Sequence, residues 1–347
     1  MADAGGKAPL LSVNGLARYF DVSAPLLNRM IERRPRQNLK AVDGVDFEIR
    51  RGETFSLVGE SGCGKSTVAR LVVGLYQPTS GYIEFDGADL ARMRSRLDQK
   101  PFRRRIQMIF QDPFASLNPR WRVRDIIAEP IRTHGLRSGA AAIRARVEEL
   151  LGQVKLAPAD GDRYPHEFSG GQRQRISIAR ALAAEPEFLV CDEPTSALDV
   201  SVQAQILNLM KELQRKLGLT YLFISHNLAV VYFISDRVGV MYLGRLVETS
   251  DAATLFAAPR HPYTRMLLDT IPDLAMTGRV RQPVAGEVPN PIDPPTGCAF
   301  HPRCPFANER CRRERPELRL DAATLVACHA VEERRLAAVA PTVPPRP

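Results

Sequence analysis

A glycine-rich run near residue 60 has the composition of a phosphate-binding loop, reading Gly-Glu-Ser-Gly-Cys-Gly-Lys-Ser from Gly59 to Ser66. Glycines let backbone N–H groups approach a polyphosphate because no Cβ intervenes. A helix beginning near Lys65 would add its N-terminal N–H groups and its dipole. Lys65 can bind the β- and γ-phosphates, and the Ser66 hydroxyl can ligate Mg²⁺. The residues expected to contact a nucleoside triphosphate are Gly59, Ser61, Gly62, Cys63, Gly64, Lys65, Ser66 and Thr67.

Two adjacent carboxylates follow an apolar run further along the chain. Phe188 to Cys191 has the pattern of a buried strand, which would deliver Asp192 and Glu193 to the carboxyl end of a sheet, where ligands of α/β proteins bind. Asp192 can join the Mg²⁺ shell, and Glu193 can orient or deprotonate an attacking water. Such a pair also occurs in ordinary acidic turns at strand ends. Its spacing from the phosphate loop is what makes it indicative of a nucleotide site.

These residues need a parallel sheet to position them. Strands are predicted at 10–20, 45–49, 54–58, 82–85, 106–110, 188–191 and 221–224, and helices at 67–75, 140–151, 172–184 and 202–217. Strands that alternate with helices indicate a parallel α/β sheet. The helical block at about 115–185 is predicted to be an inserted subdomain, and 23–38 a polar insertion. Beyond about residue 256 proline becomes frequent, and we expect a small separate extension there.

Composition sets limits on the function. The 347 residues, 44% of them hydrophobic, can bury a large core. The formal charge of +9 is compatible with nucleic acid or an anionic membrane surface as a partner, but the basic residues are scattered in short runs that are typical of solvated faces. No apolar stretch approaches the roughly 18 residues that span a bilayer, and the first ten residues do not resemble a signal peptide. The sequence thus predicts a cytoplasmic protein without structural disulfides.

Further motifs carry a family resemblance. Besides the loop and the acidic pair, Gln111 follows a predicted strand, Ser169 to Gln172 reads Ser-Gly-Gly-Gln, Ser196 to Asp199 reads Ser-Ala-Leu-Asp, and His226 follows another strand. In this order and spacing they resemble the ATP-binding-cassette (ABC) ATPases over about residues 10–255. The resemblance implies an α/β P-loop NTPase fold of the ABC type, with a parallel-sheet core, an antiparallel β subdomain and an inserted helical subdomain. It also implies a head-to-tail dimer that encloses two ATP molecules with Mg²⁺.

The resemblance assigns a role to each motif. Gln111 would reach Mg²⁺ and the attacking water, and His226 would contact the γ-phosphate, although a histidine that caps the core is an alternative. Catalysis would therefore rest on Glu193, His226 and Gln111, and Mg²⁺ on Ser66, Gln111 and Asp192. Phe20, or less well Tyr19, matches the aromatic that stacks on adenine; otherwise it is an ordinary strand aromatic. The opposite subunit's ATP would be met by Ser169, Gly170, Gly171 and Gln172, with Asp199 coupling the two sites.

The C-terminal region resembles the extension of the oligopeptide/dipeptide importer ATPases, which include nickel-importing relatives. The match rests on Arg260-His-Pro-Tyr-Thr-Arg265 and on cysteines with five, six and sixteen residues between them, namely Cys298, Cys304, Cys311 and Cys328. The resemblance implies a [4Fe–4S] cluster in some relatives. Four thiolates also suit zinc, although the Cys-x-x-Cys spacing is absent, and free buried thiols are a third possibility. His301 and His329 could replace a cysteine as ligand.

Taken together, these features predict an ATPase domain at 1–255, an extension at 256–332 and a flexible tail at 333–347. The chain would be the ATP-hydrolysing subunit of an importer for dipeptides or oligopeptides, bound peripherally at the cytoplasmic face of the inner membrane. Its partners would be a second ABC ATPase subunit, identical or different, two permease subunits and an extracytoplasmic solute-binding protein, with no nucleic acid. The alternatives are a nickel importer and, much less well supported, a soluble cassette ATPase acting on nucleic acid or the ribosome.

Overall fold

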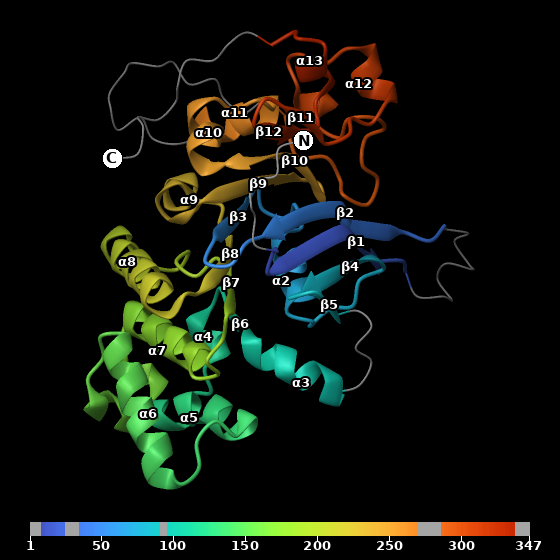
Figure 1. The fold of residues 1–347 in the computed structure, drawn as a ribbon. Coiled ribbons are helices and arrows are strands. Elements are labelled where there is room, and N and C mark those ends of the chain that lie inside the picture. Colours follow the sequence, from blue (N-terminus) through green and yellow to red (C-terminus); the bar gives the residue numbers. More distant parts are fainter. Residues whose placement is uncertain (1–7, 25–34, 91–95, 270–285, 337–347) are drawn as a thin grey trace.

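The computed structural model describes residues 8–24, 35–90, 96–269 and 286–336 (Figure 1). Most of the polar insertion predicted at 23–38, and residues 337–347 of the predicted tail, lie outside the described residues. Figure 1 shows two sheets at the centre, a group of helices below them, and the C-terminal segment above.

The larger sheet has eight strands and a parallel centre. β3 lies between β8 and β9, and β7 and β6 continue the parallel part beyond β8. Every residue of β3, β7 and β8 is buried, as expected for parallel strands covered on both faces. Across the sheet the strands are β11 (Arg319–Asp321), β12 (Thr324–Val326), β10 (Arg245–Asp251), β9 (Arg237–Tyr242), β3 (Thr54–Val58), β8 (Thr220–Ile224), β7 (Phe188–Asp192) and β6 (Ile106–Ile109).

The smaller sheet is antiparallel and lies beside the parallel centre. Its apolar side chains share one hydrophobic cluster with β3 and with α2 (Lys65–Val72), and the Phe47 ring stacks on Phe55 at a centroid distance of 5.0 Å. This arrangement covers the helix that follows the phosphate loop, and the predicted antiparallel subdomain is confirmed. In order across the sheet, its strands are β2 (Asn38–Ile49), β1 (Leu11–Asp21), β4 (Ser80–Phe85) and β5 (Ala88–Asp89).

A helical subdomain is inserted between β6 and β7, as predicted. Val123, Ile127 and Ile131 recur at helical spacing on one face, where they join a hydrophobic cluster with side chains of the neighbouring helices. α3 (Arg96–Arg105), which precedes β6, was not predicted from the sequence. The inserted elements are α4 (Pro113–Ser116), α5 (Val123–His134), α6 (Ala140–Gln153), η2 (Pro158–Asp162), η3 (Pro165–Glu167) and α7 (Gly170–Leu182).

Two further helices follow the strands β7 and β8. α8 (Val200–Leu217) begins at the Asp199 N-cap and ends at Gly218, whose φ of 66° is left-handed. Its buried face joins the cluster that contains Tyr221, whose hydroxyl donates to the Met210 carbonyl at 2.9 Å. α9 (Leu228–Ile234) is capped by Asn227. Both helices cover the sheet, as the alternating pattern predicts.

The C-terminal segment adds the strands β11 and β12 to the edge of the larger sheet. β12 pairs with β10 at Glu248↔Val326 and Thr249↔Leu325, and the Ala327 N–H donates to the Val247 carbonyl at 2.9 Å. The edge of β10 has unpaired backbone groups that need such partners. The helical turns of this segment are α10 (Ala252–Ala257), α11 (Pro262–Asp269), η4 (His301–Arg303), α12 (Glu309–Arg313) and α13 (His329–Glu332).

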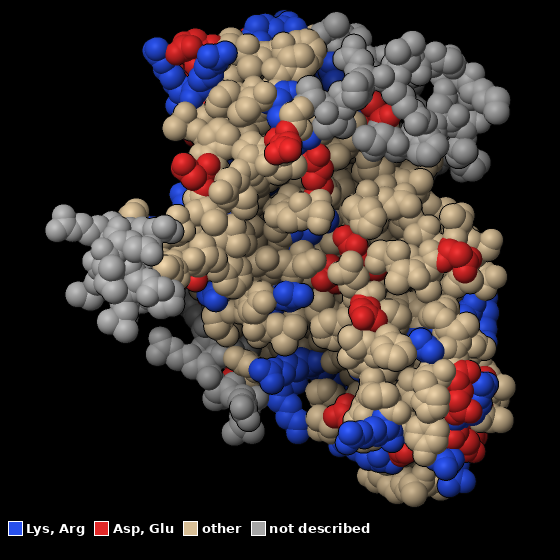
Figure 2. All heavy atoms as spheres, turned by 180° about the vertical axis from the view of Figure 1, so that it is seen from behind, with Lys and Arg blue, Asp and Glu red and all other residues tan. Residues whose placement is uncertain are grey.

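Charged side chains are spread over the surface. On the face in Figure 2, Lys and Arg lie in several separate groups with Asp and Glu between them. Part of the basic excess is paired, since Arg51 and Arg105 each contact both Asp86 and Glu187. Among the described residues, no helix combines the length and the apolar character needed to cross a bilayer.

Candidate nucleotide site

The phosphate loop has a shape that only glycine permits at two positions. A Cβ on Gly59 would lie 2.2 Å from the Met241 carbonyl oxygen, and one on Gly64 would lie 2.1 Å from the Ala41 carbonyl oxygen. Gly64 has a φ of 108° and caps α2 without a side-chain hydrogen bond. The first N–H groups of α2 therefore face the loop, where an anion can bind.

Lys65 lies at the centre of this loop and is only 5% exposed. Its Nζ donates to the carbonyls of Gly59 at 2.7 Å and Glu60 at 2.9 Å. Cys63 is buried beside it, and burial raises the pKa of the Cys63 thiol. The cysteine is thus a small buried residue of the loop, and the Lys65 ammonium is held by two backbone carbonyls of the same loop.

Ser66 and Asp192 meet across the two motifs, and the Ser66 hydroxyl donates to Asp192 Oδ1 at 2.9 Å. Burial, together with the neighbouring Glu193 carboxylate, raises the pKa of Asp192 against the effect of the Ser66 hydrogen bond. A divalent cation would relieve this burial of charge, and oxygen atoms are the ligands that Mg²⁺ prefers. These two side chains therefore fit the magnesium site that the sequence predicts.

Three adjacent strands bring Gln111, Glu193 and His226 together. β6, β7 and β8 are parallel neighbours, and these residues follow their carboxyl ends. Gln111 Nε2 donates to Glu193 Oε2 at 3.1 Å, and His226 Nδ1 lies 3.1 Å from the same oxygen. Glu193 adopts a φ of 46°, and its N–H donates to the Ile224 carbonyl at 3.0 Å. The arrangement holds one carboxylate where it can accept a proton from water.

The Ser169 to Gln172 motif opens α7. Ser169 is the N-cap, and its N–H donates to Gln172 Oε1 at 3.0 Å, completing a capping box. The Gln172 side chain is therefore used in capping the helix. A Cβ on Gly171 would lie 2.4 Å from Val202 Cγ1 of α8, and Asp199 caps α8 by accepting from the Val202 N–H at 2.9 Å. The two motifs thus form one packed junction between α7 and α8.

The two aromatic candidates for the adenine site are used differently. The Tyr19 hydroxyl donates to Asp43 Oδ1 at 2.5 Å, so this side chain already has a partner within the protein. Phe20 lies edge-on to Tyr76 at a centroid distance of 5.5 Å, with the Arg18 guanidinium 4.7 Å from its centroid. It is partly exposed, and this geometry favours Phe20 as the aromatic available to a base.

The four C-terminal cysteines lie near one another. Burial, together with the three other thiols, raises the pKa of the Cys298 thiol to about 12. Arg335 contacts Cys311 Sγ at 3.9 Å and lowers the pKa of Cys304 and Cys328 against the larger effect of burial. Within the described ranges, no three His, Cys, Asp or Glu side chains are arranged to hold a metal ion.

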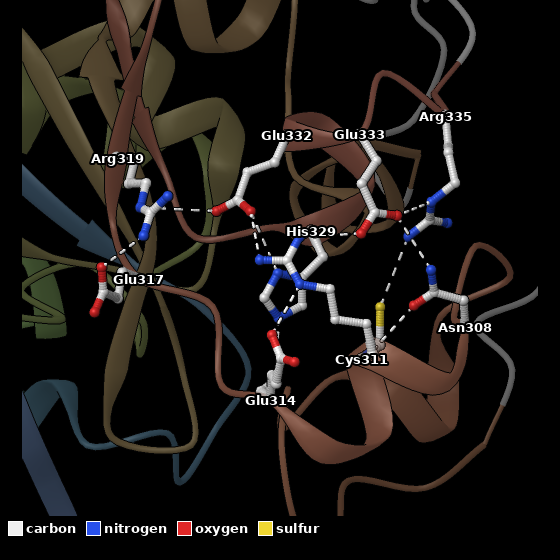
Figure 3. A network of polar contacts seen from close by, with 10 residues as sticks. Asn308, Cys311, Glu314, Glu317, Arg319, His329, Glu332, Glu333 and Arg335 are labelled. Atoms are coloured by element: carbon white, nitrogen blue, oxygen red, sulfur yellow. Dashed lines mark hydrogen bonds and ion pairs between the residues drawn. The ribbon is translucent and has the colours of Figure 1, made fainter.

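A polar network supports this cysteine segment (Figure 3). His329 is buried, with Nε2 3.1 Å from the Glu314 carbonyl oxygen and Nδ1 3.4 Å from Glu332 Oε2. Both ring nitrogens therefore have protein partners, and His301 Nδ1 lies 3.0 Å from the Cys298 carbonyl oxygen. Neither histidine points to a ligand role in this arrangement.

Three residues at the phosphate loop were not predicted as site residues from the sequence, namely Glu60, Tyr263 and Arg303. Arg303 and Tyr263, both from the C-terminal segment, bind Glu60 of the loop. They are 243 and 203 residues away from it along the chain. No local pattern could have paired them, although the Arg260 to Arg265 motif already contained Tyr263.

Comparisons with known proteins agree with this geometry. The family model for ABC transporters matches residues 42–196, and the one for the C-terminal region of oligopeptide/dipeptide transporters matches residues 247–311. YkfD of Bacillus subtilis is 52% identical over 327 residues, 93% of this chain and 96% of that protein. The oligopeptide transport ATP-binding protein AppF of the same organism is 49% identical over 330 residues, 94% of this chain and 98% of that protein.

The chain belongs to the ABC transporter ATPases. Among solved structures, this ABC ATPase is similar to the dimeric cassette MJ0796 bound to ADP and Pi after hydrolysis, with a TM-score of 0.61 and 26% identity over 70% of this chain and 98% of that one. It is also similar to cbiO1 from Clostridium perfringens, part of the ABC transporter complex cbiONQ, with a TM-score of 0.60 and 29% identity over 72% of this chain and 91% of that one. The predicted cassette fold is confirmed.

Proposed function

We propose that this ABC ATPase hydrolyses ATP to energise the uptake of dipeptides or oligopeptides through separate membrane subunits. One observation carries the proposal: Glu193, with Gln111 and His226 in contact with its carboxylate, occurs in the same chain as the matched C-terminal region of oligopeptide/dipeptide transporters. Relatives named for oligopeptide transport that match almost the whole chain support it.

The residues of the site divide the work of hydrolysis. The N–H groups of the loop and Lys65 bind the phosphates, while Ser66 and Asp192 would hold Mg²⁺, with Gln111 beside them. When bound, Mg²⁺ would neutralise charge on the β- and γ-phosphates. Glu193 accepts a proton from, or orients, the attacking water, and His226 stabilises charge at the γ-phosphate. Phe20 stacks on adenine.

Half of each site comes from a second ABC ATPase subunit in this proposal. Ser169, Gly170 and Gly171 at the N-terminus of α7 would meet the ATP bound by the partner subunit, because helix N–H groups attract anions. Gln172 keeps the capped end in place, and Asp199 ties it to α8. The dimeric state of MJ0796 supports this arrangement. The partner can be identical or different.

The remaining partners are two permease subunits and an extracytoplasmic solute-binding protein, with the ATPase bound peripherally at the cytoplasmic face of the membrane. Deleting the gene should abolish uptake of labelled peptides, and the wild-type gene should restore it whereas a Glu193→Gln gene should not. Purification of the tagged chain from membranes should recover permease subunits. Normal peptide uptake together with lost nickel uptake would instead assign the nickel-importing alternative.

We also propose that Cys298, Cys304, Cys311 and Cys328 bind a [4Fe–4S] cluster. Four mutually close thiols and a neighbouring Arg335 cation suit a cluster of negative charge. The four cysteine thiolates would each bind a different iron atom of such a cluster, so they need not converge on one point as zinc requires. Protein purified without oxygen should absorb near ~400 nm and contain iron and sulfide. The Cys304→Ser variant should lose the absorbance together with the iron and the sulfide. Metal-free protein would leave these residues as buried thiols.

A further inference from the structure

The C-terminal segment forms an ion pair with the side chain of Glu60, the second residue of the phosphate loop. Arg303 Nη1 donates to Glu60 Oε2 at 2.7 Å, and Nη2 donates to Glu60 Oε1 at 2.9 Å. Only 2% of the Arg303 side chain is exposed. A bidentate pair with a buried guanidinium fixes both the position and the orientation of the carboxylate.

The same segment also binds the backbone of Glu60. Its N–H donates to the Tyr263 hydroxyl at 2.8 Å. Tyr263 is buried among aromatic rings, 4.7 Å from Tyr242 and 5.4 Å from Phe300 between centroids. These two rings also flank the Arg303 guanidinium at 5.9 and 5.8 Å. Both contacts to Glu60 therefore come from one packed aromatic cluster.

Glu60 in turn contacts Lys65 and Cys63 of the phosphate loop. Its carbonyl accepts from Lys65 Nζ at 2.9 Å and from the Cys63 N–H at 3.3 Å. If Glu60 moved, the carbonyl that orients the Lys65 ammonium would move with it. The path from Arg303 to the phosphate-binding lysine thus runs through a single residue.

The start of α11 is fixed in turn by a buried carboxylate. Glu248 Oε1 accepts from the Arg260 N–H and Oε2 from the His261 N–H, each at 2.8 Å. His261 Nδ1 accepts from the Tyr263 N–H at 3.0 Å. The segment therefore has its own rigid base on β10, and it presents the Tyr263 hydroxyl in a defined place.

We propose that Arg303 and Tyr263 are positioning residues for ATP binding, so that the C-terminal segment completes the phosphate site of its own subunit. The inference rests on the proposed binding of ATP at this loop. If the pair served only to attach the segment to the cassette, its loss would loosen the segment without changing the affinity for nucleotide.

Affinity for MgATP, measured by titration calorimetry on the full chain with Glu193→Gln present throughout to stop turnover, tests the proposal. We expect Arg303→Met and Glu60→Gln each to weaken binding by about tenfold, and Tyr263→Phe by several-fold. The double variant Arg303→Met with Glu60→Gln should bind MgATP about as tightly as whichever single variant binds it more weakly. The two substitutions remove the same interaction, so their effects should not add.

Arg313→Met provides the matched control. Arg313 pairs with Glu309 in the same segment, but its side chain is 77% exposed, and its loss should leave the affinity unchanged. Folded Arg303→Met protein with wild-type affinity, or losses that add in the double variant, would overturn the proposal. If Arg303→Met does not fold, Tyr263→Phe and Glu60→Gln decide, since each preserves side-chain size. A background protein that bound no ATP would instead refute the proposed function.

Discussion

At Glu193, two neighbouring side chains converge on one carboxylate oxygen. Gln111 and His226 both lie 3.1 Å from Oε2, and the backbone of Glu193 adopts a φ of 46° that non-glycine residues rarely adopt. Strain of this kind persists where the surrounding structure holds it and is often associated with function. The carboxylate is thus held in a fixed orientation toward the space beyond the strand ends.

Glu193→Gln should leave ATP binding intact and reduce hydrolysis by roughly 10²-fold or more, the scale of a lost general base. The amide keeps the size of the side chain but cannot take a proton from water. Turnover and nucleotide affinity in the reconstituted transporter measure both effects. Glu48→Gln, at an exposed position of β2, is the control. Turnover close to wild type would remove Glu193 from the reaction.

Lys65→Ala should abolish nucleotide binding, because the ammonium acts on the phosphates of the bound substrate as well as on the transition state. The change also releases the carbonyls of Gly59 and Glu60, to which Nζ now donates. Titration calorimetry with MgATP checks it. Lys216→Ala, which removes an exposed lysine of α8, should bind normally; equal affinities in the two variants would contradict the assignment.

At the scale of elements, the junction of α7 and α8 allows no added atom at Gly171. A Cβ there would lie 2.4 Å from Val202 Cγ1, whose branched side chain has little freedom to move. Gly171→Ala should therefore destabilise the protein by about 1–3 kcal/mol and lower hydrolysis by displacing the start of α7. Thermal unfolding and ATPase rates measure the two effects.

Gly152→Ala is the matched control for that change. Gly152 also lies in a helix, α6, but nothing is found within 4 Å of its added Cβ. Alanine should stabilise this position by about 0.5–1 kcal/mol through the lower entropy of the unfolded chain. If both variants lost stability equally, the contact with Val202 would not be the cause.

His261 should make the C-terminal segment sensitive to acid. Burial lowers its pKa from 6.5 to about 3, so the folded protein binds fewer protons than the unfolded chain between these values. Its contribution to stability is complete above pH 6.5 and is lost as pH falls toward 3, by about 1.4 kcal/mol at pH 5.5.

His261→Gln should remove this part of the pH dependence. Melting temperatures at pH 7.5 and 5.5 provide the measurement, and the difference between wild type and variant isolates His261. Burial raises the pKa of the nearby Glu248, which gives the opposite trend, but Glu248 is present in both proteins. Equal shifts of the melting temperature in wild type and variant would show that His261 is not the group responsible.

At the scale of the whole molecule, the cassette and its C-terminal segment share a sheet and an aromatic core. A chain ending at residue 257 would lose β12 from the edge of β10, and with it Tyr263 and Phe300 from the cluster around Tyr242. We expect it to melt well below the full chain and to bind ATP more weakly, as calorimetry can measure. An unchanged melting temperature would mean that the segment is an independent unit.

Much of the site could be predicted from the sequence, because its chemistry is local. The phosphate loop, the strand before Asp192 and the cap at Ser169 each depend on residues within a few positions of one another. The contacts that link distant parts could not be predicted, since the patterns at Arg303 and at Val326 say nothing of Glu60 or β10. The domain boundary near residue 255 and the roles of the site residues, Phe20 and Asp199 among them, remain predictions.

The central position of β3 affects how the protein emerges during translation. β3 ends at residue 58, but its two neighbours, β8 and β9, end at residues 224 and 242, and Arg303 follows later still. The phosphate loop is therefore synthesised early, whereas the strands beside β3 and the Arg303 side chain that contacts Glu60 are synthesised late. A chain stalled between about residues 245 and 300 would carry every nucleotide motif but would lack the contacts of Arg303 with Glu60. We expect stalled chains of that length to bind ATP weakly and to bind chaperones. Tight ATP binding would then be acquired only after the C-terminal segment has been synthesised.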